Sequence, residues 1–228
     1  MKKLVVKHNF KKKNQQYEKY LFLLRNVDYY DLMIKGLASF ILLFVLTSAL
    51  HAAKYKTVII DPGHGGKDRG ARWGGVNEKD LNLKVAKKLE SLLKAKRIPV
   101  VMTRRSDIFL SLSQRAAIAN RYKNAIFVSI HFNAHRITSV RGIETFYAST
   151  AGKKIAGNIQ RKITSHTKTK SRGIKNGINY AVLNQTICPA VLVECGFISN
   201  PYERSRCNQS WYQALSAKGI YEGIFPSL

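Results

Sequence analysis

The chain has 228 residues, of which 45% are hydrophobic and 23% are charged. This composition is enough for one domain with a sizeable core, and it excludes a disordered chain. There are 39 Lys+Arg against 13 Asp+Glu, a formal net charge of +26. Such an excess predicts an anionic partner, which leaves nucleic acid, a membrane surface or an acidic polymer.

An uncharged apolar run, residues 36–50, follows Lys35. A membrane-spanning helix needs about 20 apolar residues, so this run is short for an anchor. Its length, basic flank and small-residue end are typical of a signal-peptide core. We therefore predict a signal peptide over residues 33–53, with an uncleaved signal anchor as the alternative. Residues 1–32 are then a basic N-terminal extension, or they reflect a start assigned upstream of Met33.

The basic excess belongs to the domain that follows this segment. Residues 1–53 contain 9 Lys+Arg and 3 Asp+Glu, so residues 54–228 keep 30 basic and 10 acidic side chains, a net charge of +20. An exported basic domain meets peptidoglycan and anionic lipid in the periplasm or cell envelope before it meets DNA. Because the chain has no recognised nucleic-acid motif, we predict no nucleic-acid partner.

Three cysteines lie in the last third of the chain: Cys188, Cys195 and Cys207. An odd count excludes a fully paired disulfide framework and leaves room for one disulfide. No CxxC spacing indicates a thiolate zinc site, so buried thiols are the default expectation.

Hydrophobic periodicity predicts alternating strands and helices from residue 57 onward. The expected strands are 57–60, 99–103, 125–130, 142–147, 180–183 and 190–193. The expected helices are 79–96, 111–122, 151–165 and a closing helix from Tyr202 or Trp211 to Gly223, with a polar, flexible stretch ending at residue 173. We predict one α/β domain over residues 54–228, with a twisted, mostly parallel sheet of about six strands flanked by helices. Functional residues should gather at the carboxyl ends of its strands.

Three candidate metal ligands stand at boundaries of these elements. His64 follows the run 58–60, which Asp61-Pro62-Gly63 ends at once. Glu78 precedes a predicted helix and His131 follows a predicted strand. A His/Glu/His set with a fourth position left to water is the usual arrangement of a zinc hydrolase. Zinc there would lower the pKa of water to about 7 and polarise a scissile carbonyl.

Glu194 is the candidate general acid and base. It follows the apolar run 189–193, which would hold it firmly, and few other acids remain in the domain. A carboxylate outside the metal shell can take a proton from water and pass it to the leaving amine. Each candidate also has a structural alternative: a histidine at a strand end often caps or packs, Glu78 suits a helix N-terminus, and Glu194 suits an ion pair.

Four motifs occur in order along the chain. They are Ile59-Ile-Asp-Pro-Gly-His-Gly-Gly-Lys-Asp68, Asn77-Glu-Lys-Asp-Leu-Asn-Leu83, Ser129-Ile-His-Phe-Asn-Ala134 and Leu192-Val-Glu-Cys-Gly-Phe-Ile-Ser-Asn200. Over residues 56 to about 224 the chain resembles the zinc-dependent N-acetylmuramoyl-L-alanine amidases of the type 3 family. The resemblance implies a Zn2+ site at His64, Glu78 and His131, with Glu194 as the catalytic glutamate. It also implies cleavage of the amide between the lactyl group of N-acetylmuramic acid and L-alanine of the stem peptide, in cell-wall remodelling or cell separation.

Four further residues are candidates for substrate binding: Arg69, Asn133, His135 and Arg172. Arg69 stands where many relatives have proline, and we expect it to meet substrate carboxylates. Asn133 belongs to the third motif, and Arg172 opens an Arg-Gly-Ile segment that also resembles the family. His135 is not expected to bind metal, because residues four apart in a strand share a direction only loosely.

The connection after Tyr147 is short. About five residues, 149–153, join it to the next helix, whereas some cell-division amidases insert an inhibitory helix there. We predict no inhibition in cis, with peptidoglycan stem peptide and glycan as partners and an activator protein as an open candidate. Two rival functions are a non-catalytic peptidoglycan-binding module, disfavoured by the four site residues, and a cytosolic nucleic-acid binder, disfavoured by the apolar run.

Overall fold

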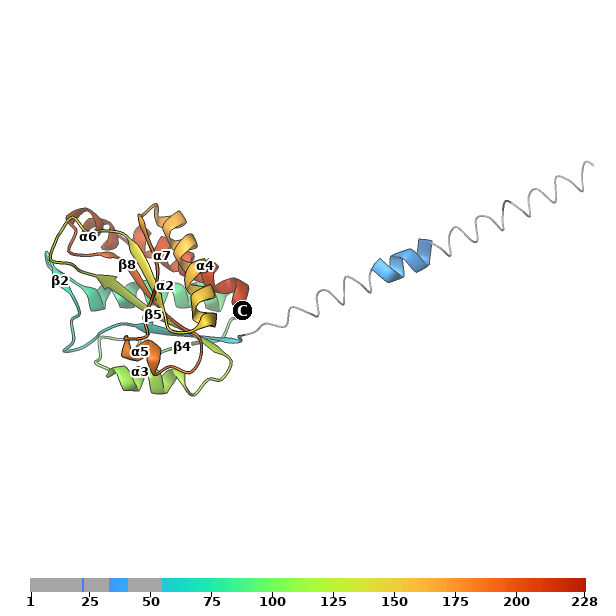
Figure 1. Cartoon of the computed structure of the whole chain (residues 1–228), viewed down its shortest axis with the longest axis horizontal. Coiled ribbons are helices and arrows are strands. Elements are labelled where there is room, and N and C mark those ends of the chain that lie inside the picture. Colours follow the sequence, from blue (N-terminus) through green and yellow to red (C-terminus); the bar gives the residue numbers. More distant parts are fainter. Residues whose placement is uncertain (1–21, 23–32, 41–54) are drawn as a thin grey trace, which may run out of the picture. The chain divides into compact units, whose positions relative to one another are not determined.

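The structure is a computed structural model that describes residue 22, residues 33–40 and residues 55–228. The chain divides into two units, Met1–Ala52 and Ala53–Leu228. Residues 33–40 are helical and exposed (Figure 1). Most of the predicted signal peptide (33–53) and of the extension (1–32) lies outside the described residues. Among the helices that the structure does describe, none is both long enough and apolar enough to cross a membrane.

Strands and helices alternate through the second unit (Figure 1). The strands are β1 (Thr57–Pro62), β2 (Arg72–Trp73), β3 (Val76–Asn77), β4 (Val100–Met102), β5 (Ala125–Asn133), β6 (Ile143–Tyr147), β7 (Ser171–Asn176) and β8 (Ala190–Phe197). The helices are α2 (Glu78–Ala95), α3 (Leu112–Ala119), α4 (Thr150–Thr167), α5 (Ala181–Asn184), α6 (Pro201–Cys207) and α7 (Ser210–Ile224), followed by the 3-10 turn η1 (Phe225–Ser227).

Six strands form one sheet in the order β4-β1-β5-β8-β6-β7. Every neighbouring pair is parallel except β6 with β8, which is antiparallel. The prediction of a single α/β domain with a mostly parallel sheet of about six strands is confirmed. Because β8 lies between β5 and β6, a late segment of the chain occupies the centre of the sheet. The short strands β2 and β3 form a separate hairpin.

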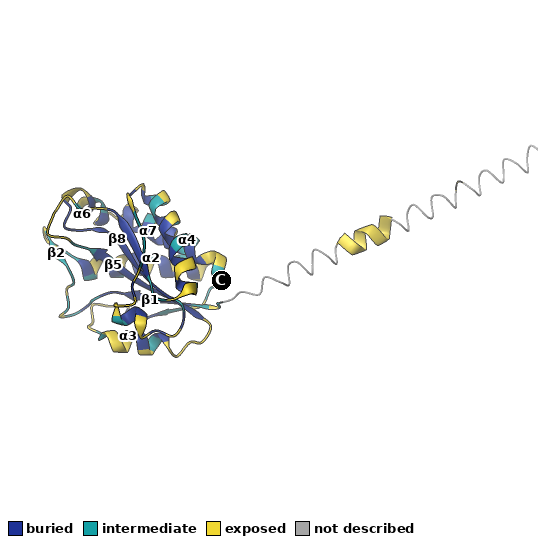
Figure 2. Ribbon diagram, viewed as in Figure 1, coloured by how far each residue is buried: buried dark blue, intermediate teal, exposed yellow. Residues whose placement is uncertain are grey.

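The sheet is buried on both faces (Figure 2). Val58 and Ile60 of β1 point into the larger core, on the face that α2, α4 and α7 cover. Ile59 points the other way, into a smaller core beneath α3 and α5. A strand covered on both faces needs apolar side chains at every position, which explains the unbroken apolar run of β1. The three cysteines are buried and unpaired, in agreement with the expectation of buried thiols.

Two predicted elements are wrong. Residues 180–183 were expected as a strand, but Ala181–Asn184 forms the short helix α5, which buries Val182 and Leu183 against the smaller core. A short apolar run does not distinguish a strand from a helical turn. The sixth strand is instead β7, in the stretch expected to be flexible. It is an edge strand with little buried surface, so its sequence carries no strong apolar pattern.

Helices α4 and α7 approach each other closely through glycine. A Cβ added to Gly219 of α7 would collide with Ile163 Cα and lie 2.8 Å from Ile163 N. Gly223, one turn later, faces the backbone of Ile159 in the same way. These glycines let the two helix backbones meet, so the larger core depends on the absence of side chains there.

We expect Gly219→Ala to lower the free energy of unfolding by about 1–3 kcal/mol, because the added methyl group overpacks this contact. Gly157→Ala in α4 is the matched control: a Cβ there meets no atom within 4 Å. Alanine is the better helix former, so the control should gain about 0.5–1 kcal/mol. Urea denaturation of both variants measures the difference. Equal effects of the two substitutions would contradict the close contact.

Candidate active site

The turn after β1 places His64 at the carboxyl edge of the sheet. His64 has a φ of 61°, in the left-handed region that non-glycine residues seldom adopt. Two buried arginines hold this turn by its backbone. Arg104 donates hydrogen bonds to the carbonyls of Pro62 and Gly63, both at 2.9 Å. Arg115 donates to the carbonyls of Pro62 at 2.8 Å and His64 at 2.7 Å.

Asp61, just before the turn, links the neighbouring strands and helix through its carboxylate. Its carboxylate forms an ion pair with Arg115 at 2.7 Å, and both side chains are almost fully buried. It also accepts hydrogen bonds from the hydroxyls of Thr103 at 2.6 Å and Ser129 at 2.8 Å. The carboxylate therefore links β1 to β5, to α3 and to the loop after β4. These links hold the start of the turn that carries His64.

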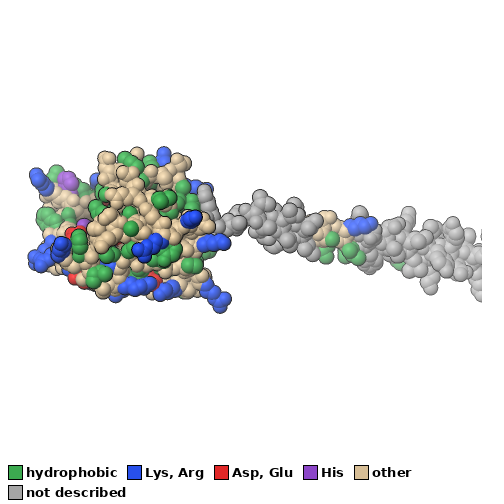
Figure 3. Space-filling model, turned by 90° about the horizontal axis from the view of Figure 1, so that it is seen from below, with side chains coloured by type: hydrophobic (Ala, Val, Ile, Leu, Met, Phe, Trp, Pro, Cys, Tyr) green, Lys and Arg blue, Asp and Glu red, His purple; other side chains and the backbone are tan. Residues whose placement is uncertain are grey.

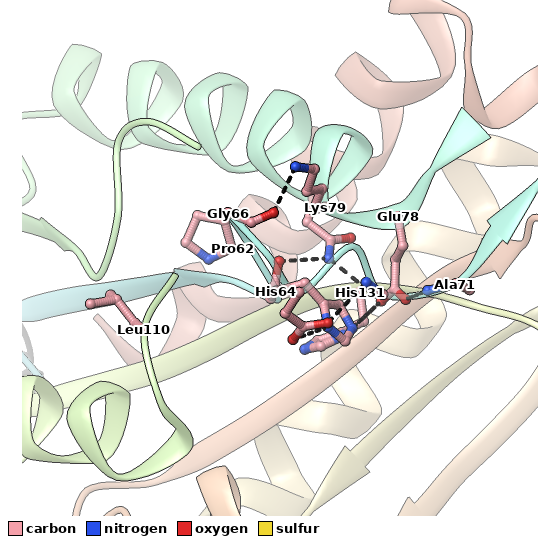
Figure 4. Close-up of polar contacts among 12 residues, drawn as sticks. Pro62, His64, Gly66, Ala71, Glu78, Lys79, Leu110 and His131 are labelled. Atoms are coloured by element: carbon pink, nitrogen blue, oxygen red, sulfur yellow. Dashed lines mark hydrogen bonds and ion pairs between the residues drawn. The ribbon is translucent and has the colours of Figure 1, made fainter. Parts of the chain in front are cut away.

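Three candidate ligands meet next to this turn (Figure 4). His64 Nε2 lies 3.1 Å from Glu78 Oε1, and His131 Nδ1 lies 2.8 Å from the same oxygen. One ligand atom from each residue falls within 4.8 Å of the other two. His64 follows β1, Glu78 is the first residue of α2, and His131 lies within β5. The sequence placed His131 after its strand, but β5 continues to Asn133.

Glu78 is the common acceptor of the centre. Besides the two imidazoles, it accepts hydrogen bonds from the backbone N–H groups of Ala71 at 2.9 Å and Phe132 at 3.2 Å. Burial raises the pKa of Glu78, but the hydrogen bonds with His131 and His64 outweigh it and hold the pKa far below its usual range. Glu78 is therefore ionised at neutral pH, as a metal ligand must be.

His64 is oriented by a second carboxylate. Its Nδ1 lies 2.7 Å from Asp68 Oδ2, and Asp68 is itself fixed by the backbone N–H of Gly70 at 3.0 Å. Burial lowers the pKa of His64, but the hydrogen bonds and charges of Glu78 and Asp68 raise it overall. With Nδ1 engaged by Asp68, Nε2 is the nitrogen turned toward Glu78. A carboxylate on the outer nitrogen is the usual support of a metal-binding histidine.

Two glycines let the backbone close around these donors. A Cβ on Gly63 would overlap the His131 imidazole. A Cβ on Gly70, which has a φ of 63°, would lie 2.5 Å from Glu78 Oε2 and 2.6 Å from His64 Cδ2. Imidazole nitrogen and carboxylate oxygen are ligands that zinc accepts. The donor set, its convergence and its tight support fit a divalent cation at this position.

A cleft of about 380 Å³ opens beside the three ligands, and Glu194 lines it. Glu194 lies within β8, directly opposite His131 on β5. Its Oε2 is buried and has no hydrogen-bond partner among the described residues. Burial raises the pKa of Glu194, and the negative charges of Glu78 and Glu144 raise it further. Glu194 is thus a buried carboxyl that faces the cleft and has a high affinity for a proton.

Apolar side chains form the cleft's outer walls. Leu112 of α3 lines the cleft with 53% of its surface exposed, and Tyr180 lines it with 39% exposed. A second hollow of about 220 Å³ continues from Leu112 past Phe109 and reaches the same two histidines. The site is therefore a groove open to solvent, and the two hollows together leave room for an extended ligand beside the candidate metal ligands.

Of the four predicted substrate-binding residues, Asn133 lines the cleft. Its amide donates to Glu144 at 2.9 Å. Arg172 does not line it: its Nε donates to Glu144 at 2.8 Å, so its guanidinium is engaged by a buried carboxylate. Arg69 and His135 are exposed and do not line the cleft either. The structure thus brings the three metal ligands, Glu194 and Asn133 together, and leaves the other three outside.

Sequence reasoning missed several residues that support the site: Asp61, Asp68, Arg104, Arg115 and Glu144. Asp68 belongs to the first motif, and Arg115 to a segment that resembles the family, so both had a signal. Arg104 begins a charged Arg-Arg pair that looks like ordinary surface. Glu144 lies in the predicted strand 142–147, where the sequence alone gives no sign that an acid would be only 4% exposed. Arg172 and Lys175 satisfy its charge, which makes this burial tolerable.

These features define a class of protein. Three nitrogen and oxygen donors, a free buried carboxyl and an open groove at the carboxyl edge of an α/β sheet are the parts of a metal-dependent hydrolase. Comparison with known proteins identifies the family. Residues 58–225 match the N-acetylmuramoyl-L-alanine amidase family, and the chain belongs to it.

Individual relatives agree with this assignment. The chain is 37% identical to the N-acetylmuramoyl-L-alanine amidase LytC of Bacillus subtilis over 172 residues, 74% of this chain and 34% of LytC, so it spans about a third of that relative. The crystal structure of an N-acetylmuramoyl-L-alanine amidase from Clostridium difficile 630 is 40% identical, with a TM-score of 0.71 over 75% of this chain and 96% of that one. The CwlD amidase from Clostridioides difficile, solved in complex with the GerS lipoprotein, is 33% identical, with a TM-score of 0.72 over 75% and 96%.

Gly63→Ala should displace the His131 ring and lower the affinity for zinc at least tenfold, since the added methyl group overlaps the imidazole. Metal content after dialysis against a zinc buffer measures the loss, and circular dichroism verifies the fold. Gly157→Ala, the same change where a Cβ meets nothing, should keep its metal. Full zinc occupancy in Gly63→Ala would exclude this packing of the centre.

Glu144→Gln tests the buried carboxylate next to Glu194. Burial raises the pKa of Glu144, but hydrogen bonds from Lys175 and Arg172 lower it overall. A lowered folded-state pKa contributes stability above the unfolded value of 4.5, and the contribution disappears as pH falls through the folded value. We expect the variant to be about 1–3 kcal/mol less stable at neutral pH. The difference from the native chain should shrink under acidic conditions.

Denaturation curves at pH 7 and in the acidic range measure this change. The control is Glu222→Gln, which removes a more exposed acid paired with His166 and Lys162, and it should have a smaller effect at neutral pH. A loss of stability that is the same at both pH values would show that the Glu144 charge is not what stabilises the fold.

Proposed function

We propose that this chain is a zinc-dependent peptidoglycan amidase that hydrolyses the amide between the lactyl group of N-acetylmuramic acid and L-alanine of the stem peptide. The observation that carries the proposal is the convergence of His64, Glu78, His131 and Glu194 on one open groove, in a member of the amidase family. Cell-wall remodelling or cell separation is the process that such an activity serves.

His64, Glu78 and His131 would hold the zinc ion. When bound, zinc supplies a Lewis acid that acidifies water and polarises the amide carbonyl. The protein prepares this site: Asp68 orients His64, and backbone N–H groups hold the Glu78 carboxylate. The donors are thereby fixed before any ligand arrives, which lowers the cost of organising the site.

Glu194 would move the proton. As the carboxylate, it accepts a proton from the water that attacks the lactyl carbonyl; as the acid, it delivers that proton to the nitrogen of L-alanine while the C–N bond breaks. The products are a free lactyl carboxylate and a free amino group. Burial raises the pKa of Glu194, which helps this carboxyl to hold the proton until the leaving nitrogen takes it.

The groove suggests where the substrate lies. Its apolar walls at Leu112 and Tyr180 suit the methyl groups of the lactyl and alanyl units. Asn133 offers an amide within the cleft, where it can hydrogen-bond to the peptide. Arg69 and His135 are exposed outside the cleft and would contact the stem peptide or glycan only further from the scissile bond. Arg172 would act through Glu144 instead of touching the substrate.

The substrate also implies a place of action. We propose that residues 33–53 direct export, and that residues 54–228 act in the cell envelope, with retention by an uncleaved signal anchor as the alternative. Peptidoglycan lies outside the cytoplasmic membrane, so an enzyme that cleaves it needs export. Residues 1–32 would then be a basic extension of the signal, or lie upstream of the true start.

We propose that no inserted helix inhibits this chain at the connection between β6 and α4. β6 ends at Tyr147 and α4 begins at Thr150, so residues 148–149 alone connect them. The solved complex of the CwlD amidase with the GerS lipoprotein makes a lipoprotein a candidate partner of this chain too. We propose that such a partner would act without having to withdraw a helix from this connection.

The decisive experiment is mass spectrometry of muropeptides after incubation with the purified chain alone. We expect free stem peptides that begin with L-alanine, together with peptide-free glycan. A chelator should stop the reaction and zinc should restore it. Glu194→Gln should lower kcat by about 10²- to 10⁴-fold, the usual contribution of a general acid or base, while zinc content stays unchanged.

Glu90→Gln is the matched control, because this acid of α2 pairs with Lys94 and Arg105 away from the cleft, and it should keep its activity. Cleavage of glycosidic bonds, or of peptide bonds within the stem, would refute the assignment. Binding to peptidoglycan without any product would favour the rival function of a binding module. Full activity that appears only after another protein is added would contradict the prediction that no segment of the chain inhibits its own active site.

A further inference from the structure

A cluster of arginines and aromatic rings lies on α6 and the start of α7, outside the catalytic groove. The guanidinium of Arg206 lies over three rings, with its carbon 5.3 Å from the ring centre of Tyr202, 5.5 Å from that of Trp211 and 5.2 Å from that of Tyr212. Arg141 lies over the Tyr202 ring as well, at 6.0 Å. We call Arg141, Tyr202, Arg206 and Trp211 the arginine–aromatic patch.

The patch lies at the surface, where Arg141 is exposed and Arg206 is half-buried. Tyr202 has 59% of its surface in solvent and Trp211 has 50%, which is high for large aromatic side chains. Neither ring fills the core, so packing does not account for their position. The rings instead hold the guanidinium of Arg206, whose N–H also donates to the carbonyl of Thr167. An arginine pinned in this way loses little side-chain freedom when its remaining N–H groups bind an anion.

The positive charge of the patch is not neutralised. Within the part of the chain that the structure describes, no ion pair involves Arg141 or Arg206. The acid of α6, Glu203, is 2% exposed, and its two oxygens accept from the backbone N–H groups of Gly142 and Phe197. Its carboxylate therefore points inward. Arg141 and Arg206 thus place two guanidinium groups near one ring, 6.0 and 5.3 Å from its centre, without a carboxylate partner in the described structure.

Neighbouring lysines extend this charge. Lys168 and Lys170 are exposed, and their segment is joined to the patch, because Arg206 donates to Thr167 and Ile143 donates to the Lys170 carbonyl. Lys and Arg side chains outnumber acidic ones on the face drawn in Figure 3 as well. The patch differs from that general charge because aromatic rings hold its cations in place.

The patch shares an edge of the sheet with the catalytic groove. β8 carries Glu194 and ends at Phe197, and α6 begins at Pro201, only a few residues later. β6 and β7, which begin next to Arg141 and Lys170, start at this same edge, because they run antiparallel to β8. A polymer held by the patch would therefore lie at the end of the domain where the groove opens.

We propose that the arginine–aromatic patch binds a phosphodiester-linked anionic polymer of the cell wall. Fixed guanidinium groups match phosphate oxygens in pairs, and exposed rings suit the polyol or sugar carbons between successive phosphates. Binding there holds the domain on the wall while the groove stays free for the stem peptide. This function goes beyond amide hydrolysis, and it gives the net charge of +20 of residues 54–228 a specific point of contact.

The test is co-sedimentation of the full chain with insoluble Gram-positive cell walls, either intact or treated with hydrofluoric acid to remove phosphodiester polymers. The native chain should bind intact walls and lose at least tenfold in affinity on treated walls. Arg141→Gln/Arg206→Gln should weaken binding to intact walls about tenfold. It should also lower the slope of log affinity against log salt by about 1–2, because two phosphate contacts are lost.

The charge-matched control is Lys96→Gln/Arg121→Gln, which removes two exposed cations from the opposite edge of the sheet, where β4 and β5 begin. It should bind within about twofold of the native chain. Circular dichroism and thermal unfolding report the fold of each variant and should match those of the native chain. If Arg206→Gln disturbs the fold, Arg141→Gln alone should still weaken binding about threefold, since Arg141 stacks only on an exposed ring.

Three results would overturn the proposal. Equal weakening by the patch and control variants would mean that net charge alone attracts the domain. Undiminished binding to treated walls would assign the attraction to peptidoglycan itself. Tighter binding to single-stranded RNA than to isolated phosphodiester polymer of equal charge would make the patch a nucleic-acid site. None of these results depends on amidase activity, so failure here leaves the proposed reaction standing.

Discussion

The turn at the end of β1 depends on two arginines buried within the protein. Arg104 and Arg115 bring positive charge into the interior, which is costly unless every N–H finds a partner. Those partners are backbone carbonyls that a tight turn would otherwise leave unsatisfied, together with the carboxylate of Asp61. The guanidinium groups and the backbone carbonyls thus satisfy each other, and neither is buried without a hydrogen-bond partner. The left-handed conformation of His64, and with it the direction of its imidazole, follows from this exchange.

Three buried acids at the sheet edge differ in pKa because their neighbours differ. Glu78 has imidazole and backbone donors and stays ionised, and Glu144 is ionised beside Arg172 and Lys175. Glu194 lies between them in a similar degree of burial, but its Oε2 has no partner in the described structure, and both neighbours are negative. The same functional group therefore has a lowered or a raised pKa according to its surroundings.

The sequence predicted the elements correctly where a residue pattern fits only one type of secondary structure. The doubly buried strands β1 and β5, the long amphipathic helix α2 and the capped helix α3 all appear near their expected places, and the four motifs pointed to one sheet edge. Prediction failed where packing decided between alternatives. β7 carries almost no apolar pattern, and residues 181–184 become helical only because Val182 and Leu183 fill the smaller core.

The same limit applies to the site. Chemistry-bearing residues with a motif, such as His64, Glu78, His131 and Glu194, could be found from spacing and residue type. Their supports could not, because Arg104 and Glu144 look like ordinary surface residues until the fold buries them. Arg172 shows the converse: a guanidinium in a family-like segment suggested ligand binding, yet a buried carboxylate occupies it. Which partner a charge finds is a property of the tertiary structure alone.

The central position of β8 has a consequence for how the molecule comes into being. The three candidate metal ligands lie between residues 64 and 131, after β1, at the start of α2 and within β5, whereas Glu194 lies on β8, which stands between β5 and β6 in the sheet. A chain that emerges from its N-terminus can bring the ligands near one another early, but its sheet stays split until residues 190–197 are available. Glu194, the candidate general acid and base, is thus the last residue of the candidate site to join the sheet. A chain without residues 190–197 would therefore contain the candidate metal ligands but lack both Glu194 and the middle strand of its sheet.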